Sequence, residues 1–233
     1  MTYCISDIHG CYNEFEKLLS AVSFTDDDTL YILGDAVDRG YDSLKCLLRI
    51  MDAPNMHMLM GNHEKLMING LKYDDKLDWF YNGGKKTLDE LSNYNDDVKN
   101  KITEYLLELP YHFTYETETT KFLLVHAGIR VNPALAGEQL ESIMAYQNLD
   151  DLIWIRESFI NYPGLPGYTI IFGHTPTQYL RMADGSSPPV WHDETFGDKI
   201  AIDGGCVYGI ANRGALNAIC LDNMKKFTVY NKN

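Results

Sequence analysis

The sequence has few basic residues, no paired cysteine motif and no long hydrophobic run. Its 20 lysines and arginines are outnumbered by 33 aspartates and glutamates, which gives a formal net charge of −13. Nucleic-acid binding depends on clustered lysine and arginine, so we expect no nucleic-acid partner. No stretch approaches the roughly 18 apolar residues of a membrane span, and no signal peptide is recognisable. These absences predict a cytoplasmic protein with no membrane partner.

The five cysteines are widely spaced and form no CxxC pair, so we expect reduced, structural thiols. With 45% hydrophobic and 23% charged residues, the composition is that of an ordinary globular protein. A protein of this charge that acts on anionic substrates needs a local positive centre, such as bound metal ions.

The first third of the chain alternates strand-like and helix-like segments, as in βαβ units. Strands are predicted over Thr2–Ser6, Thr29–Leu33 and Asn55–Met60, with apolar residues at helical spacing between them. The pattern then turns helical and more polar, which predicts a helical insertion at about residues 66–109. Residues 137–159 are again predicted to be helical.

The second half of the chain is rich in strand-like segments. They are Tyr111–Glu116, Lys121–Val125, Tyr168–Phe172, Pro189–Trp191, Lys199–Ile202, Ala215–Leu221 and Lys226–Tyr230. No linker separates the two halves. We therefore predict a single domain over residues 1–233 of the mixed α/β class, with a two-sheet sandwich core flanked by helices.

Polar side chains that can bind metals follow five of the predicted strands. They are Asp7 and His9, Asp35 and Asp38, Asn62 and His63, His126, and His174. Ligands of α/β sheets collect at the carboxyl ends of strands, so these residues are expected to converge. Each has a structural alternative, a helix cap for an aspartate or a buried core position for a histidine. The joint pattern favours one common site.

Carboxylate, imidazole and amide donors without thiolate favour ions such as Mn²⁺, Fe²⁺ or Zn²⁺. Six candidate ligands are too many for one catalytic ion that keeps open positions. Two ions that share a carboxylate use all of them, and such pairs stabilise both oxygens of a displacement at phosphorus. The sequence thus predicts phosphoester hydrolysis with two divalent ions, with Mn²⁺ preferred and iron or zinc as alternatives.

Five short segments together resemble the PPP-type metallophosphatases, and among them the small bacterial and bacteriophage serine/threonine phosphatases. They are SDIHG (6–10), GDAVDRG (34–40), GNHE (61–64), HAG (126–128) and GHT (173–175). The resemblance spans about residues 2–220 and implies the calcineurin-like metallophosphoesterase fold. The chain departs from the family pattern at Ser6 and Met60, where glycine and arginine are usual.

The resemblance also implies a role for each matching residue. A first metal is expected on Asp7, His9 and Asp35, with Asp35 bridging to a second metal on Asn62, His126 and His174. His63 is expected to act as general acid, oriented by Asp38, and a metal-activated water as nucleophile. The phosphate is expected to contact Arg39, Arg156 and Asn62.

We therefore expect a phosphomonoester hydrolase, in first place a serine/threonine protein phosphatase acting on a phosphoprotein or a phosphorylated small molecule. One alternative is a symmetrical bis(5′-nucleosyl)-tetraphosphatase, because HGCY at residues 9–12 is similar to that family. Those enzymes tend to lack the counterpart of Asp38 and to have aspartate in place of Glu64. A second alternative is a metal-loaded phosphoprotein binder without turnover.

Overall fold

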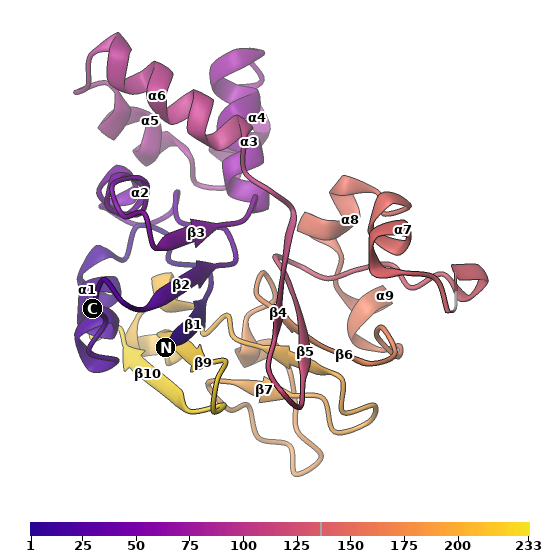
Figure 1. The fold of residues 1–233 in the computed structure, drawn as a ribbon. Coiled ribbons are helices and arrows are strands. Elements are labelled where there is room, and N and C mark those ends of the chain that lie inside the picture. The colour runs from indigo at the N-terminus through magenta and orange to yellow at the C-terminus, as the bar shows by residue number, and fades with distance from the viewer. Residues whose placement is uncertain (136) are drawn as a thin grey trace.

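Two five-stranded sheets form the centre of the fold in the computed structural model, which describes residues 1–135 and 137–233 (Figure 1). In spatial order the first sheet contains β10 (Lys226–Tyr230), β9 (Ala215–Cys220), β1 (Thr2–Ile5), β2 (Thr29–Ile32) and β3 (Met56–Met58). The second contains β4 (His112–Glu116), β5 (Lys121–Val125), β6 (Tyr168–Phe172), β8 (Lys199–Ala201) and β7 (Trp191–His192). The expected two-sheet α/β architecture is therefore confirmed.

Both sheets are mixed: the first is antiparallel only on its β9–β10 side, and the second is antiparallel at both edges. Strands β1, β2 and β3 run parallel to one another, as do β5, β6 and β8. Consequently the predicted site residues, which follow β1, β2, β3, β5 and β6, all leave the carboxyl ends of parallel strands. That is the edge where α/β sheets place their ligands.

The two sheets pack against each other through one apolar layer. Cys4 and Leu33 of the first sheet lie in the same buried cluster as Leu124 and Ile171 of the second. Neighbouring residues on the same strands, such as Ile5 and Ile170, belong to the larger core under the helices. This alternation is the period of two expected for strands covered on both faces.

Helices cover the outer faces of both sheets (Figure 1). Helices α1 (Tyr12–Ala21) and α2 (Ser43–Met51) flank the first sheet, and their buried faces include Phe15, Leu18 and Leu47. The second sheet is flanked by α7 (Leu140–Ala145), α8 (Leu149–Trp154) and α9 (Glu157–Ile160). Within the described residues, no helix has both the length and the apolar character needed to cross a membrane.

The helical prediction for residues 137–159 is only partly right, because three short helices replace a continuous one. The side chain of Asn148 accepts the amide of Asp150 and so begins α8 anew. Arg156 has φ −134° and ψ −103°, which separates α8 from α9. The strand expected at Pro189–Trp191 also shifts, to Trp191–His192. Proline lacks the amide that a strand ladder requires.

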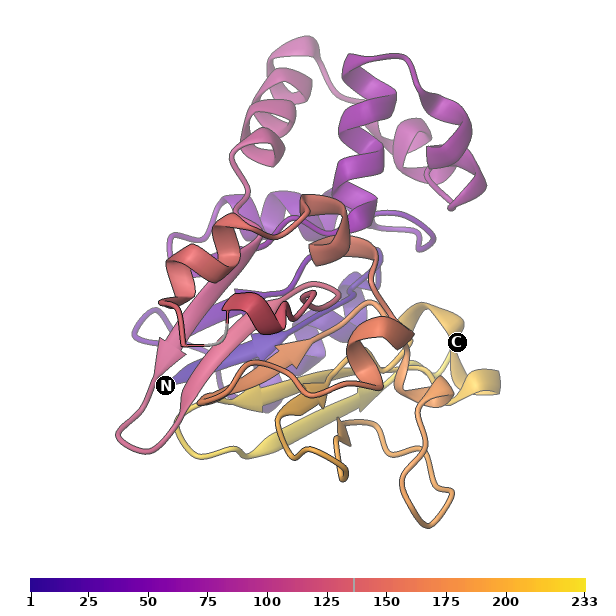
Figure 2. The same cartoon turned by 90° about the vertical axis from the view of Figure 1, so that its right-hand side faces the viewer.

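Four helices connect β3 to β4: α3 (Asn62–Lys72), α4 (Lys76–Tyr81), α5 (Lys85–Leu91) and α6 (Asp96–Leu107). Figure 2 shows them standing to one side of the two sheets. Helix α3 begins at Asn62, earlier than the residue 66 expected from periodicity. Glu64 accepts the amide of Gly61 and caps the helix there.

Four short 3₁₀ turns lie in the connections: Pro133–Leu135, Thr177–Tyr179, Cys206–Tyr208 and Ile210–Asn212. The last two follow β8 and lead into β9. They therefore connect the second sheet to the first.

Asn217 links the two sheets through a buried amide. Its Nδ2 donates to the carbonyls of Pro189 at 2.7 Å and Ile202 at 3.1 Å, and Thr228 Oγ1 donates to its Oδ1 at 2.8 Å. We expect Asn217→Ala to lower the free energy of unfolding by about 2–3 kcal/mol, because two buried carbonyls lose their donor. Urea denaturation measures the change.

The matched control is Thr228→Val, which removes one hydroxyl and leaves both carbonyls paired. It is expected to cost about 1 kcal/mol. A loss in Asn217→Ala no larger than in this control would show that the amide does not join the sheets.

Candidate metal centre

Left-handed backbone conformations are concentrated in the predicted site. Six of its non-glycine residues have φ between 46° and 72°: Asp7, His9, Asp35, Asp38, Arg39 and His174. This region costs an L-residue free energy, and it persists where the surrounding structure holds the backbone in place. The turns after β1, β2 and β6 are thus shaped to direct side chains into one place.

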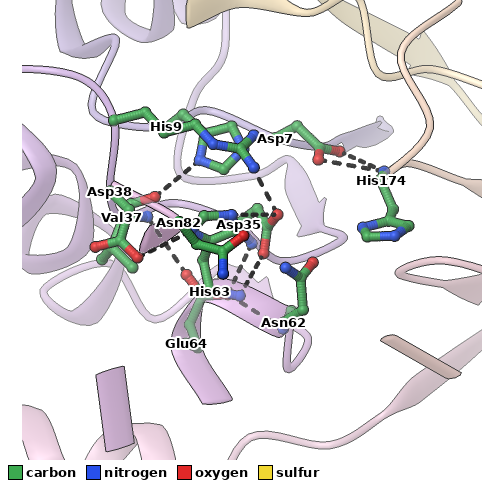
Figure 3. Close-up of polar contacts among 12 residues, drawn as sticks. Asp7, His9, Asp35, Val37, Asp38, Asn62, His63, Glu64, Asn82 and His174 are labelled. Carbon is green, nitrogen blue, oxygen red and sulfur yellow. Dashed lines mark hydrogen bonds and ion pairs between the residues drawn. The ribbon is translucent and has the colours of Figure 1, made fainter. Parts of the chain in front are cut away.

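Asp35 lies at the centre of that place (Figure 3). Its Oδ2 is 3.5 Å from Nε2 of His9 and 3.5 Å from Nε2 of His126. Two groups of potential metal ligands share Asp35, one with His9 and His63 and the other with His126 and His174. The ligand atoms of each group lie within 4.8 Å of one another. One carboxylate between two ligand groups is the geometry of a bridging ligand.

The Nδ1 hydrogen bonds of His9 and His126 set which nitrogen of each ring carries the lone pair that can bind a cation. Nδ1 of His9 is 2.9 Å from the carbonyl of Val37, and Nδ1 of His126 is 2.6 Å from the carbonyl of Leu33. A carbonyl only accepts, so both Nδ1 atoms donate, and Nε2 presents a lone pair when the ring is neutral. Nε2 of His174 is buried without a hydrogen-bond partner.

Asn62 is the amide donor of the group. Its Oδ1 is 2.9 Å from Nε2 of His126. In this orientation of the amide, a carbonyl oxygen faces a nitrogen lone pair across that distance. A shared cation satisfies both atoms, as the predicted common ligation requires.

The electrostatics of the site also favour cations. Burial lowers the pKa values of His9, His126 and His174, which keeps these imidazoles neutral. Burial, and then the charge of Asp7, raise the pKa values of Asp35 and Asp203. Neutral imidazoles and crowded carboxylates in a buried site are what divalent ions stabilise. The described residues therefore fit a pair of metal ions.

Asp7 lies at the same edge but belongs to neither group of close ligand atoms. Both oxygens of its carboxylate accept the backbone amide of His174, at 3.0 and 3.2 Å (Figure 3). A Cβ on Gly173 would stand 2.1 Å from Asp7 Oδ2, so only glycine allows this approach. Asp7 thus ties the turn after β1 to the turn after β6.

His63 pairs with Asp38 in the buried interior. Its Nδ1 is 2.8 Å from Asp38 Oδ2, while its Nε2 has no hydrogen-bond partner among the described residues. Burial raises the pKa of Asp38 to about 7, and hydrogen bonds from Thr87 and Trp79 oppose that shift. These two residues come from the helical insertion, and no motif in the sequence indicated that they reach the site.

Glu64 and Asp203 are further residues for which the sequence gave no role. Glu64 is fully buried and accepts the amides of Asp35, Ala36 and Gly61 at 2.7, 2.9 and 3.1 Å. It therefore holds the turn that carries Asp35. Its place in the GNHE segment was the available signal. Asp203 is buried and accepts the amide of Gly205 at 2.8 Å.

The two predicted phosphate-binding arginines both reach the site. Nη1 of Arg39 donates to Nε2 of His9 at 2.8 Å. Nη1 of Arg156 donates to the carbonyl of His174 at 3.0 Å and to Oγ1 of Thr175 at 3.1 Å. The two guanidinium groups thus add positive charge next to His9 and His174.

Comparisons with known proteins point to one family. A family model described as calcineurin-like phosphoesterase matches residues 2–218. Serine/threonine-protein phosphatase 2 of Salmonella typhimurium is 27% identical over 213 residues, which cover 87% of this chain and 86% of that protein. The symmetrical bis(5′-nucleosyl)-tetraphosphatase of Delftia acidovorans is 33% identical over 163 residues, 65% of this chain. That match spans 54% of the tetraphosphatase, about half of its length.

Solved structures agree on the fold. A crystal structure of a candidate diadenosine tetraphosphatase superposes with a TM-score of 0.69 at 23% identity, covering 100% of this chain and 94% of that chain. A serine/threonine phosphatase from Saccharomyces cerevisiae, similar to human phosphatase PP5, has a TM-score of 0.60 at 16% identity. It covers 100% of this chain and 79% of that chain. At these identities the likeness shows the fold.

The buried acids predict how stability depends on pH after metal removal. Burial raises the pKa of Asp38 from 3.8 to about 7 and that of Glu64 from 4.5 to about 8. Over this range the folded protein holds protons that the unfolded chain has released, so rising pH destabilises the fold. The site histidines, with pKa values lowered from 6.5, oppose this trend only below about pH 6.5. Between about pH 6.5 and 8 we expect the chelator-treated protein to lose stability.

Urea midpoints of chelator-treated protein across that window measure the effect. The expected slope is about 1.4 kcal/mol per pH unit for each proton released. Restoring a divalent metal is expected to flatten the slope, because the cation replaces the protons. Stability that rises from pH 6.5 to 8 would contradict the assignment.

Proposed function

Because the chain belongs to the calcineurin-like phosphoesterase family, whose members are metal-dependent hydrolases, we propose that it is a serine/threonine protein phosphatase. The single observation that carries the proposal is the buried pair of His63 and Asp38 beside two ligand groups that share Asp35. A serine or threonine alkoxide is a poor leaving group and needs a proton as it departs. The pair supplies a donor for that proton.

Six residues are proposed to hold two Mn²⁺ ions: Asp7, His9, Asp35, Asn62, His126 and His174. When bound, such a pair supplies a water activated near neutral pH and neutralises charge on the phosphoryl group. Asp35 would be a ligand shared by the two ligand groups, since its carboxylate lies 3.5 Å from Nε2 of both His9 and His126. A turn of the backbone at Asp7 completes one side of the site through its contact with His174.

The chain's own groups are proposed to bind and orient the substrate. Arg39 and Arg156 direct guanidinium groups toward the phosphoryl oxygens, and Asn62 adds an amide. Arg39 now donates to Nε2 of His9 and must turn away from it when that nitrogen binds a metal. His63 is proposed to act in its imidazolium form, which burial disfavours and Asp38 stabilises through Nδ1, and to pass the Nε2 proton to the departing alkoxide, which leaves the ring neutral.

The symmetrical tetraphosphatase remains the alternative function. The 33% identity to the Delftia enzyme over 163 residues favours it. The Salmonella phosphatase, in contrast, aligns over 86% of its own length, and both Asp38 and Glu64 are present. A phosphoprotein binder without turnover is disfavoured by the same buried pair, which binding alone does not need.

Replacement of His63 tests the proposed proton donor. We expect His63→Asn to lower kcat on a phosphoserine peptide by about 10²–10³-fold while KM changes little. Metal content, measured by mass spectrometry of the purified protein, is expected to stay at the wild-type level. His63 also lies in one ligand group with His9 and Asp35, so loss of metal together with activity would make it a ligand instead.

The substrate class is tested on manganese-loaded protein. We expect kcat/KM for a phosphoserine peptide to exceed that for diadenosine tetraphosphate by at least about tenfold. The reverse ratio would establish the tetraphosphatase alternative. Tight binding of the phosphopeptide without hydrolysis of it or of p-nitrophenyl phosphate would favour the binder.

A further inference from the structure

Two side chains from the helical insertion hold the carboxylate of Asp38. Nε1 of Trp79, on α4, donates to both oxygens of Asp38, at 3.0 Å to Oδ1 and 2.9 Å to Oδ2. Oγ1 of Thr87, on α5, donates to Oδ1 at 2.6 Å. All three residues are fully buried, with an exposed fraction of 0%. The carboxylate therefore has a complete set of protein donors in a site without solvent.

These hydrogen bonds fix the orientation of the Asp38 carboxylate and therefore the position of His63, which donates to it. Oδ1 accepts from Thr87 and Trp79, and Oδ2 accepts from Trp79 and from Nδ1 of His63. Rotation of the carboxylate breaks several bonds at once, in a region of low dielectric where each bond is strong. The imidazole is thereby held with its Nε2 turned toward Asp35, at 4.0 Å from Oδ2.

The indole of Trp79 is itself fixed by close packing. A Cβ added at Gly84 would lie 2.1 Å from the indole, and one at Gly70 would lie 2.4 Å from it. Backbone thus contacts the ring from both α3 and the start of α5. The ring has no room to shift, so its N–H is aimed at Asp38 before any substrate binds.

The insertion also contacts the backbone next to Asp38. The carbonyl of Gly83 accepts the amide of Arg39 at 3.3 Å, and Nζ of Lys86 donates to the carbonyl of Arg39 at 3.0 Å. The carboxylate of Glu90 accepts the amides of Ser43 and Leu44, at the start of α2. The insertion therefore hydrogen-bonds to the backbone at both ends of the segment 38–44.

We propose that Trp79 and Thr87 are positioning residues for proton donation, which they control by fixing Asp38 and, through it, the His63 imidazole. This inference rests on the proposed function. It gives the helical insertion a role inside the protein, as a support for the general acid. Among the described residues, the side-chain hydrogen bonds of both go to Asp38 and to none of the proposed metal ligands, so we expect their loss to leave metal content unchanged.

Loss of either positioning residue is expected to affect substrates differently according to their leaving group. An alkoxide needs a proton as the ester bond breaks, whereas p-nitrophenolate is stable enough to leave without one. Misplacing His63 therefore slows hydrolysis of a phosphoserine peptide far more than hydrolysis of p-nitrophenyl phosphate. A general loss of fold or of metal slows both equally.

Thr87→Val removes the hydroxyl and keeps the shape of the side chain. We expect kcat on the phosphoserine peptide to fall about 10- to 100-fold, and kcat on p-nitrophenyl phosphate to fall less than about threefold. KM and metal content stay at wild-type values. Thr87→Ser, which restores the hydroxyl, is expected to recover most of the activity on the peptide.

The matched control is Thr103→Val. Thr103 lies on α6 of the same insertion and donates its hydroxyl to the carbonyl of Lys99, away from Asp38. This variant is expected to behave as wild type on both substrates. Equal losses on both substrates in Thr87→Val, no loss at all, or the same selective loss in Thr103→Val would each overturn the proposal.

Trp79→Phe is a second variant that keeps an aromatic ring in the pocket between Gly70 and Gly84. It is expected to show the same selective loss on the peptide. The NMR signal of the His63 Nδ1 proton provides a readout independent of turnover, and it is expected to move upfield in both Trp79→Phe and Thr87→Val as the bond to Asp38 weakens. An unchanged signal would overturn the positioning role even if the protein hydrolyses neither ester, so this failure is distinct from failure of the proposed function.

Discussion

The carboxylate of Asp35 is the constraint on which the rest of the site depends. It is buried between His9 and His126, and burial together with Asp7 raises its pKa. Such a group is stable only if its turn is held firmly and a positive charge is near. Glu64 supplies the first condition by accepting the amide of Asp35 itself, and a pair of cations supplies the second. Glu64 thus has a structural role, because it holds the turn that carries the buried Asp35.

Local positive charge is also what reconciles the acidity of the chain with an anionic substrate. A protein of net charge −13 repels phosphate esters over most of its surface. Under the proposed function, attraction comes from a few local centres, the proposed cations at Asp35 together with the guanidinium groups of Arg39 and Arg156. The overall acidity then disfavours nonspecific polyanions.

The strand ends and the residues that follow them could be predicted because both depend on short-range pattern. Asp35 and His126 emerge from parallel strands, and parallel strands place their carboxyl ends together. The long-range contacts could not be predicted in this way. Trp79 reaches Asp38 across 41 residues, and which face of α4 turns inward is decided by the packing of Gly70 and Gly84. The break between α8 and α9 falls at Arg156, whose side chain donates to His174 and Thr175, residues distant in the sequence.

His63 is held by two hydrogen bonds, one from its backbone and one from its imidazole. Its backbone amide donates to Oδ1 of Asp35 at 3.0 Å, on the side of the metal ligands. Its imidazole is held by Asp38, on the side of the insertion. The first bond fixes the backbone of His63 next to Asp35, and the second fixes the direction of its imidazole. Because the two bonds are supported from different parts of the chain, the proposed metal binding depends on the sheet edge, whereas the proposed proton donation also depends on the insertion.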